Sequence, residues 1–140
     1  MRKLISAIAM AALAAAALAS TAGAANPSAQ TAHFSVQAIQ TSGHRGPNNS
    51  FVFTERLRRH HRVIGHDRVQ CRQATNRGLL RCKAVFFLPE GKIKAQGNFG
   101  AGNNKLAVVG GTSAFNGVSG KLLVHNKRGN RSRLEFLLVR

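Results

Sequence analysis

Glu55 is the acidic side chain best placed for chemistry in this sequence, because it shares a face with aromatic residues. In an extended segment, alternation puts Phe51, Phe53, Glu55 and Leu57 on one side. A carboxyl group buried among apolar side chains has a raised pKa and can act as a general acid or base, or stabilise a cation that develops during a cyclisation. The structural alternative is that Glu55 pairs with an arginine near the mouth of the fold.

The two cysteines, Cys71 and Cys82, lie at equal distances from a turn formed by Asn76, Arg77 and Gly78. Such positions face each other in an antiparallel hairpin and can form a disulfide, although a bulge at Gly78 would shift the register by one. An exported chain favours this crosslink over a metal site. The alternative is that Cys71 is a free thiol in a pocket.

A basic run at residues 58–62 (RRHHR), with His66 and Asp67 close behind, has the side chains for a metal or phosphate site. The neighbouring cations repel a metal, and Asp67 is the only nearby carboxylate. A solvated basic loop is therefore the favoured interpretation. No metal and no cofactor is predicted.

The whole chain is strongly basic, with 21 Lys and Arg against 4 Asp and Glu and a net charge of +17. This charge attracts polyanions in a salt-dependent way. The sequence has no series of stacking aromatics and no helix-turn-helix pattern, so a specific nucleic acid is not predicted. Anionic polymers and membrane surfaces are equally compatible partners.

Residues 1–25 have the organisation of a signal peptide. A positive start is followed by an Ala-rich apolar run from Leu4 to Leu18 and then by small residues. The run is shorter than the roughly 20 residues that cross a bilayer. Cleavage near Ala24 or Ala25 is expected, which predicts a secreted or periplasmic protein.

The remaining chain predicts a flexible leader at residues 26–31 and one domain at residues 32–140. Short β-type segments joined by Gly, Asn and Pro turns indicate antiparallel neighbours, in a barrel or a sandwich. Closure removes exposed strand edges, so an all-β, eight-stranded antiparallel barrel is predicted. The expected strands are His33–Gln40, Ser50–Leu57, Arg62–Asp67 continuing as Val69–Gln73, Leu79–Leu88, Lys92–Phe99, Leu106–Val109, Val118–Asn126 and Ser132–Val139.

The most distinctive stretch is residues 106–120, LAVVGGTSAFNGVSG. It resembles the V-x-G-G-T-x-x-[FY]-x-G-x-x-G signature of allene oxide cyclases and dirigent proteins. Residues 53–57 (FTERL), 63–65 (VIG), Cys71 and residues 96–97 (QG) also follow the order of that family's motifs. The resemblance implies an eight-stranded barrel with a mostly apolar cavity, and a homotrimer as in many plant members.

The family's site residues match this chain only in part. Glu55 stands where the cyclases have an asparagine that helps to hold a water and where dirigent proteins have an aspartate. Cys71 matches the family cysteine, but Phe99 replaces a pocket tyrosine, and the first predicted strand lacks the cyclases' glutamate.

These motifs lead to two functional hypotheses. The first is a secreted barrel that binds a small hydrophobic molecule and cyclises it, or controls its conformation during a reaction; as an enzyme it would be an isomerase. Glu55 is its candidate catalytic residue, and the candidate pocket residues are Phe51, Phe53, Cys71, Phe87 and Phe99. The second is a non-catalytic basic protein that attaches to anionic envelope or extracellular polymers.

Overall fold

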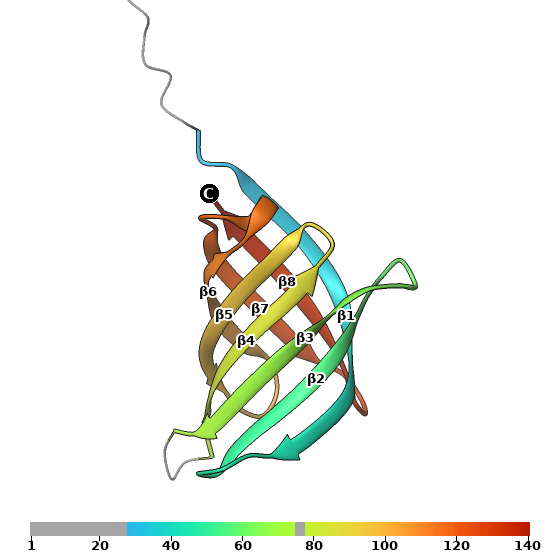
Figure 1. The fold of residues 1–140 in the computed structure, drawn as a ribbon, viewed down its shortest axis with the longest axis vertical. Coiled ribbons are helices and arrows are strands. Elements are labelled where there is room, and N and C mark those ends of the chain that lie inside the picture. The colour runs from blue at the N-terminus through green and yellow to red at the C-terminus, as the bar shows by residue number, and fades with distance from the viewer. Residues whose placement is uncertain (1–27, 75–77) are drawn as a thin grey trace, which may run out of the picture.

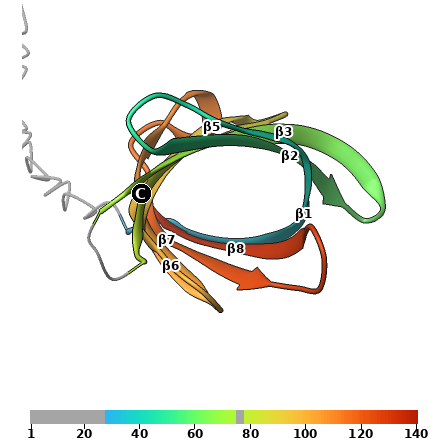
Figure 2. The ribbon, with the colours of Figure 1, turned by 90° about the horizontal axis from the view of Figure 1, so that it is seen from below.

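The computed structural model describes residues 28–74 and 78–140, and these form a closed antiparallel β-barrel (Figures 1 and 2). Each strand pairs with its neighbours in sequence, and the first pairs with the last. The predicted fold class is therefore confirmed. The elements are β1 (Thr31–Arg45), β2 (Ser50–Arg59), β3 (Arg62–Gln73), β4 (Leu80–Leu88), β5 (Gly91–Phe99), β6 (Asn104–Gly111), the 3₁₀ helix η1 (Ser113–Phe115), β7 (Ser119–Asn126) and β8 (Arg131–Val139).

Strict alternation of side chains builds the core inside the barrel. In β4, for example, Cys82, Ala84, Phe86 and Leu88 are all buried, and the residues between them face outward. Inward-facing aromatic rings form a layer across the lumen: Phe136 lies 4.9 Å from Phe34 and 5.1 Å from Phe86, measured between ring centroids. The period-2 pattern in the sequence thus separates the packed interior from the charged exterior.

β1 is longer than the sequence predicts. Its first part pairs with β8, and its second part pairs with β2 as far as Arg45. Ile39 is the last residue of β1 that pairs with β8. A register shift between Gln40 and Ser42 then bends the strand, which continues along β2 alone. The stretch after Gln40 is polar and lacks the apolar alternation that would predict a strand. Backbone pairing with β2, rather than burial of side chains, extends β1 there.

The glycine-rich signature forms a corner at one end of the barrel, where η1 and the C-terminus lie (Figure 1). Phe115 is buried there, and its ring centroid lies 6.2 Å from that of Phe34. A Cβ atom on Gly111 would lie 2.5 Å from the carbonyl oxygen of Phe115 and 2.6 Å from that of Lys92. Only glycine permits so close an approach of the backbones.

A disulfide joins Cys71 on β3 to Cys82 on β4, which confirms the predicted crosslink and excludes a free thiol at either position. The two residues are direct partners in the register of the strands, so no bulge shifts the pairing. Asn76 and Arg77 of the predicted turn, like residues 1–25, lie outside the described residues. In the part of the chain that is described, no helix has the length and hydropathy to cross a membrane.

Candidate functional site

The lumen contains a cavity of about 270 Å³ whose walls come from inward-facing residues of all eight strands. The β7–β8 loop borders the cavity at the end of the barrel remote from η1. We call this space the lumen cavity. Its lining consists of Gln40, Phe53, Glu55, Val69, Cys82, Ala84, Phe86, Phe99, Leu106, Leu122, Val124, Asn126, Lys127, Gly129, Asn130, Arg131, Ser132 and Leu134.

Two carboxyl groups lie side by side at the wall of this cavity. Glu55 on β2 and Asp67 on β3 are direct partners in the strand register, and both side chains face inward. The backbone N–H of Glu55 donates a hydrogen bond to Oδ1 of Asp67, at 3.0 Å. Glu55 lines the cavity, whereas Asp67 is 0% exposed and lies behind it.

Burial changes the acidity of both groups. It raises the pKa of Glu55 above the ordinary 4.5, and hydrogen bonds with the side chains of Asp67 and Ser132 offset part of the rise. Burial, aided by repulsion from Glu55, raises the pKa of Asp67 from 3.8 to about 9. Asp67 therefore holds a proton at neutral pH, beside a Glu55 carboxyl group whose ionisation is also disfavoured by burial.

The structural alternative for Glu55, an ion pair with an arginine, does not occur among the described residues. The acids that do form ion pairs there are Glu90, with Arg59, and Glu135, with two histidines. Asp67 Oδ2 is buried and has no hydrogen-bond partner in the described part of the chain. A neutral, protonated Asp67 reduces the cost of burying such an atom.

The structure places the five predicted pocket residues in four different environments. Phe53 and Phe99 line the lumen cavity. Phe51 lies beyond its lining, where the guanidinium of Arg45 sits 5.1 Å from the ring centroid. Cys71 is buried in the disulfide, and Cys82 is the cysteine that reaches the cavity.

Phe87 does not line the cavity. It stands on the outer face, with its ring 4.6 Å from the ring of His66, because the alternation of β4 turns Phe86 inward. Adjacent phenylalanines in a strand cannot both face the lumen. Phe86 takes the lining position that the sequence analysis assigns to Phe87.

Asp67 is the site residue that sequence reasoning missed. In the sequence it stands out only as the carboxylate beside the basic run, yet its side chain points into the barrel. The available signal was the alternation of Asp67, Val69 and Cys71, which puts Asp67 on the inner face. The register that brings it opposite Glu55 depends on the length of the β2–β3 turn, where His60 and His61 have φ angles of 48° and 64°.

That turn holds the basic run, and its contacts are those of a surface loop. Arg58 donates a hydrogen bond to the carbonyl of His61, and Arg59 pairs with Glu90 at 3.2 Å. His66 and Asp67 face opposite sides of β3. Across residues 28–74 and 78–140, no group of three or more His, Cys, Asp or Glu side chains could hold a metal ion.

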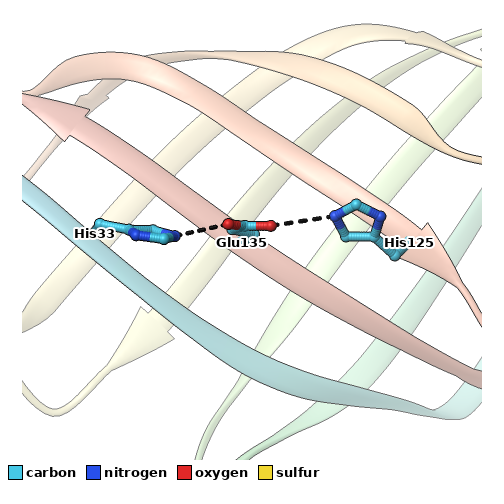
Figure 3. A network of polar contacts seen from close by, with 3 residues as sticks. All are labelled: His33, His125 and Glu135. Carbon is cyan, nitrogen blue, oxygen red and sulfur yellow. Dashed lines mark hydrogen bonds and ion pairs between the residues drawn. The ribbon is translucent and has the colours of Figure 1, made fainter.

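A second polar cluster lies on the outer surface and spans three strands (Figure 3). Glu135 on β8 lies between His33 on β1 and His125 on β7, with N–O distances of 2.7 Å and 3.2 Å. Hydrogen bonds with the two histidines lower the pKa of Glu135 below its ordinary value. The cluster connects the first and the last two strands where the barrel closes.

Comparison with known proteins identifies the fold but no family. No family model matches the chain, and no curated protein matches it. Among solved structures, the chain is similar to a pyocyanin demethylase, with a TM-score of 0.67 and 17% identity over 78% of this chain and 100% of that one. It is also similar to AbnU, an exo-specific intermolecular Diels–Alderase, with a TM-score of 0.66 and 16% identity over 81% of this chain and 99% of that one.

A third similar structure is a nonspecific heme-binding cyclase that catalyses a [4 + 2] cycloaddition during neoabyssomicin biosynthesis. Its TM-score is 0.60 and its identity 12%, over 79% of this chain and 64% of that one. At these identities the likeness shows the fold alone. The shared architecture is that of small barrels, among them cyclases.

Proposed function

We propose that this chain is an exported protein whose lumen binds a small hydrophobic molecule and cyclises it, or fixes its conformation while it reacts. The observation that carries the proposal is the lumen cavity itself, with mostly apolar walls, polar residues towards the β7–β8 loop and a buried pair of carboxyl groups. Its volume of about 270 Å³ is close to the roughly 300 Å³ at which small-molecule pockets begin. A compact ligand with few polar groups fits this space.

Glu55 is the group that meets the ligand, and Asp67 is a positioning residue that acts through it. Asp67 holds the Glu55 backbone by a hydrogen bond, and its side chain also hydrogen-bonds the Glu55 carboxyl group, which offsets part of the rise in pKa that burial causes. A carboxyl group with a raised pKa can give a proton to an oxygen of the ligand and take one back. As an anion, it would stabilise positive charge that develops during ring closure.

Confinement supplies the other part of the mechanism. A ring closure or cycloaddition forms its new bonds without a leaving group, so holding the reacting carbons in one geometry lowers the barrier directly. Two of the similar barrels are described as catalysing such cycloadditions, which supports this class of reaction. More specifically, we propose that the barrel is of the type found in allene oxide cyclases and dirigent proteins, whose sequence motifs it resembles.

Export is the second element of the proposal. The Cys71–Cys82 disulfide fits an oxidising compartment, and the signal-like residues 1–25 would direct the chain there. The mature protein would then meet its ligand outside the cytoplasm.

Binding of the neutral fluorophore N-phenyl-1-naphthylamine tests the lumen as a ligand site. Ala84 lines the cavity, so Ala84→Phe should fill it and abolish the fluorescence increase. Ala107→Phe is the matched control, because this residue is exposed and lies outside the cavity lining. Val124→Phe narrows the same cavity on β7 and serves as a second blocking variant if Ala84→Phe is unstable. Undiminished binding by both blocking variants would show that the lumen is not the site.

A further inference from the structure

Away from the β2–β3 turn, where Arg62 lies, the outer face of β3, β4 and β5 carries six exposed basic side chains, two from each strand. We call this set the outer basic face: Arg68, Arg72, Arg81, Lys83, Lys92 and Lys94. The strand register arranges them in adjacent rows. Arg72 is opposite Arg81, Lys83 lies one row further, and Arg68 and Lys94 flank Val85 in the next.

No acidic side chain neutralises this face. The chain has only 4 acids, and each is engaged elsewhere. Glu55 and Asp67 are inside the barrel, Glu90 pairs with Arg59, and Glu135 lies between two histidines on β8. None of the six bases forms an ion pair among the described residues.

Like charges that face each other across strands destabilise a sheet, so an arrangement such as Arg72 opposite Arg81 favours an anion between them. Side chains on one face of a strand repeat about every 7 Å, which presents the cations at regular intervals. Three of the six bases, Arg72, Arg81 and Lys83, also line a groove of about 260 Å³ beside the loop at Pro47 and Asn48. The disulfide between β3 and β4 fixes the two strands that carry them.

The chemistry of the face distinguishes among polyanions. Proteins that bind single-stranded nucleic acids without sequence preference stack the bases on exposed aromatic rings. The only aromatic ring on these rows apart from His66 is Phe87, which is half-buried and already lies between His66 and the Lys92 ammonium. An anionic membrane favours exposed apolar anchors, but the exposed large hydrophobic residues, Val63, Leu79, Val109 and Val139, all lie outside the rows.

We propose that the outer basic face binds a linear acidic polysaccharide, whose sulfate or carboxylate groups pair with Arg72, Arg81 and Lys83 along the groove. Guanidinium groups bind these anions in a bidentate way, and the regular spacing suits a polymer with repeating charges. The binding does not depend on the lumen cavity, which opens inside the barrel. The protein would thus hold an anionic matrix on its outside and a small molecule within.

Titration calorimetry with a heparin decasaccharide at several salt concentrations tests this inference. Replacing Arg72, Arg81 and Lys83 with glutamine should weaken binding at least about 10-fold and reduce the slope of log affinity against log salt by roughly 2 to 3. The matched control replaces three exposed bases elsewhere with glutamine, Lys105, Lys121 and Arg128, and has the same net charge. It should lose far less affinity.

Equal losses in the two triple variants would overturn the proposal, because net charge alone would then explain the binding. Tighter binding of a dT10 oligonucleotide or of phosphatidylglycerol vesicles than of the decasaccharide would also overturn it. Melting curves check that both variants fold. The single variant Lys83→Gln keeps both arginines and should reduce the salt slope by about 1, which provides the same test if the triple variant is unstable.

Discussion

The backbone N–H of Glu55 donates a hydrogen bond to Oδ1 of Asp67, and this contact brings two carboxyl groups together inside a strongly basic protein. Both have raised pKa values because they are buried. Half of the chain's 4 acids are thus placed where their charged forms are least stable. The structure offers no ion-pairing reason for this among the described residues, which is why we connect the pair with a ligand.

Asp67→Asn should flatten the dependence of stability on pH. The folded-state pKa of Asp67 is about 9 and the ordinary value is 3.8, so the folded protein binds more protons between these values and loses stability as the pH rises through that window. Asparagine keeps an oxygen that can accept the Glu55 N–H but does not ionise. Melting temperatures from pH 5 to 9 should therefore fall less for the variant than for the wild type. Parallel pH curves would contradict the raised pKa.

Glu135→Gln should remove a contribution to stability that is present at neutral pH and lost in acid. The pKa of Glu135 is lowered by His33 and His125, so its contribution to stability is present above pH 4.5 and is lost as the pH falls through the lower folded value. The variant should melt below the wild type at pH 6, and the difference should shrink towards pH 3. Glu90→Gln is a control for the loss of an exposed carboxylate. An equal effect of both variants at every pH would show that the histidine contacts add nothing.

The sequence predicted the barrel well because alternation and turn residues are local signals. The inward positions of β4 and the buried Phe115 at the glycine corner follow from them. The site was predicted only in part, because the proximity of Glu55 and Asp67 depends on pairing between strands rather than on pattern within one. The wrong assignment of Phe87 has another cause, because the alternation of Cys82, Ala84 and Phe86 already indicates that Phe87 faces outward.

Gly111→Ala should lower stability more than Gly117→Ala. A Cβ at position 111 would lie within 2.7 Å of three atoms of Phe115 and Lys92, whereas at position 117 it would meet nothing within 4 Å. Gly117 has a φ of 75°, so its replacement should cost only the backbone strain of about 1 to 2 kcal/mol. Chemical denaturation of both variants measures the difference. A larger loss at position 117 would mean that the corner depends on backbone conformation rather than on close packing.

Intact mass spectrometry of exported protein should show a chain that begins near residue 25 or 26 and is two hydrogens lighter than its reduced form. Replacing Cys71 and Cys82 with serine should lower the free energy of unfolding by about 2 to 3 kcal/mol, because the sequence separation of 11 closes only a short loop. Quantitative thiol labelling without a reductant would contradict the disulfide.

Carboxyl ¹³C NMR titration tests the central claim most directly, because Asp67 is the only aspartate in the chain and Glu55→Gln assigns one of three glutamates. We expect the Asp67 carboxyl to remain protonated through neutral pH and Glu55 to titrate above its ordinary 4.5. N-phenyl-1-naphthylamine in the lumen should raise the pKa of Glu55 further, because an apolar ring displaces water beside the carboxyl group. Ordinary titration of both residues, or a Glu55 signal that does not respond to the bound fluorophore, would contradict the account.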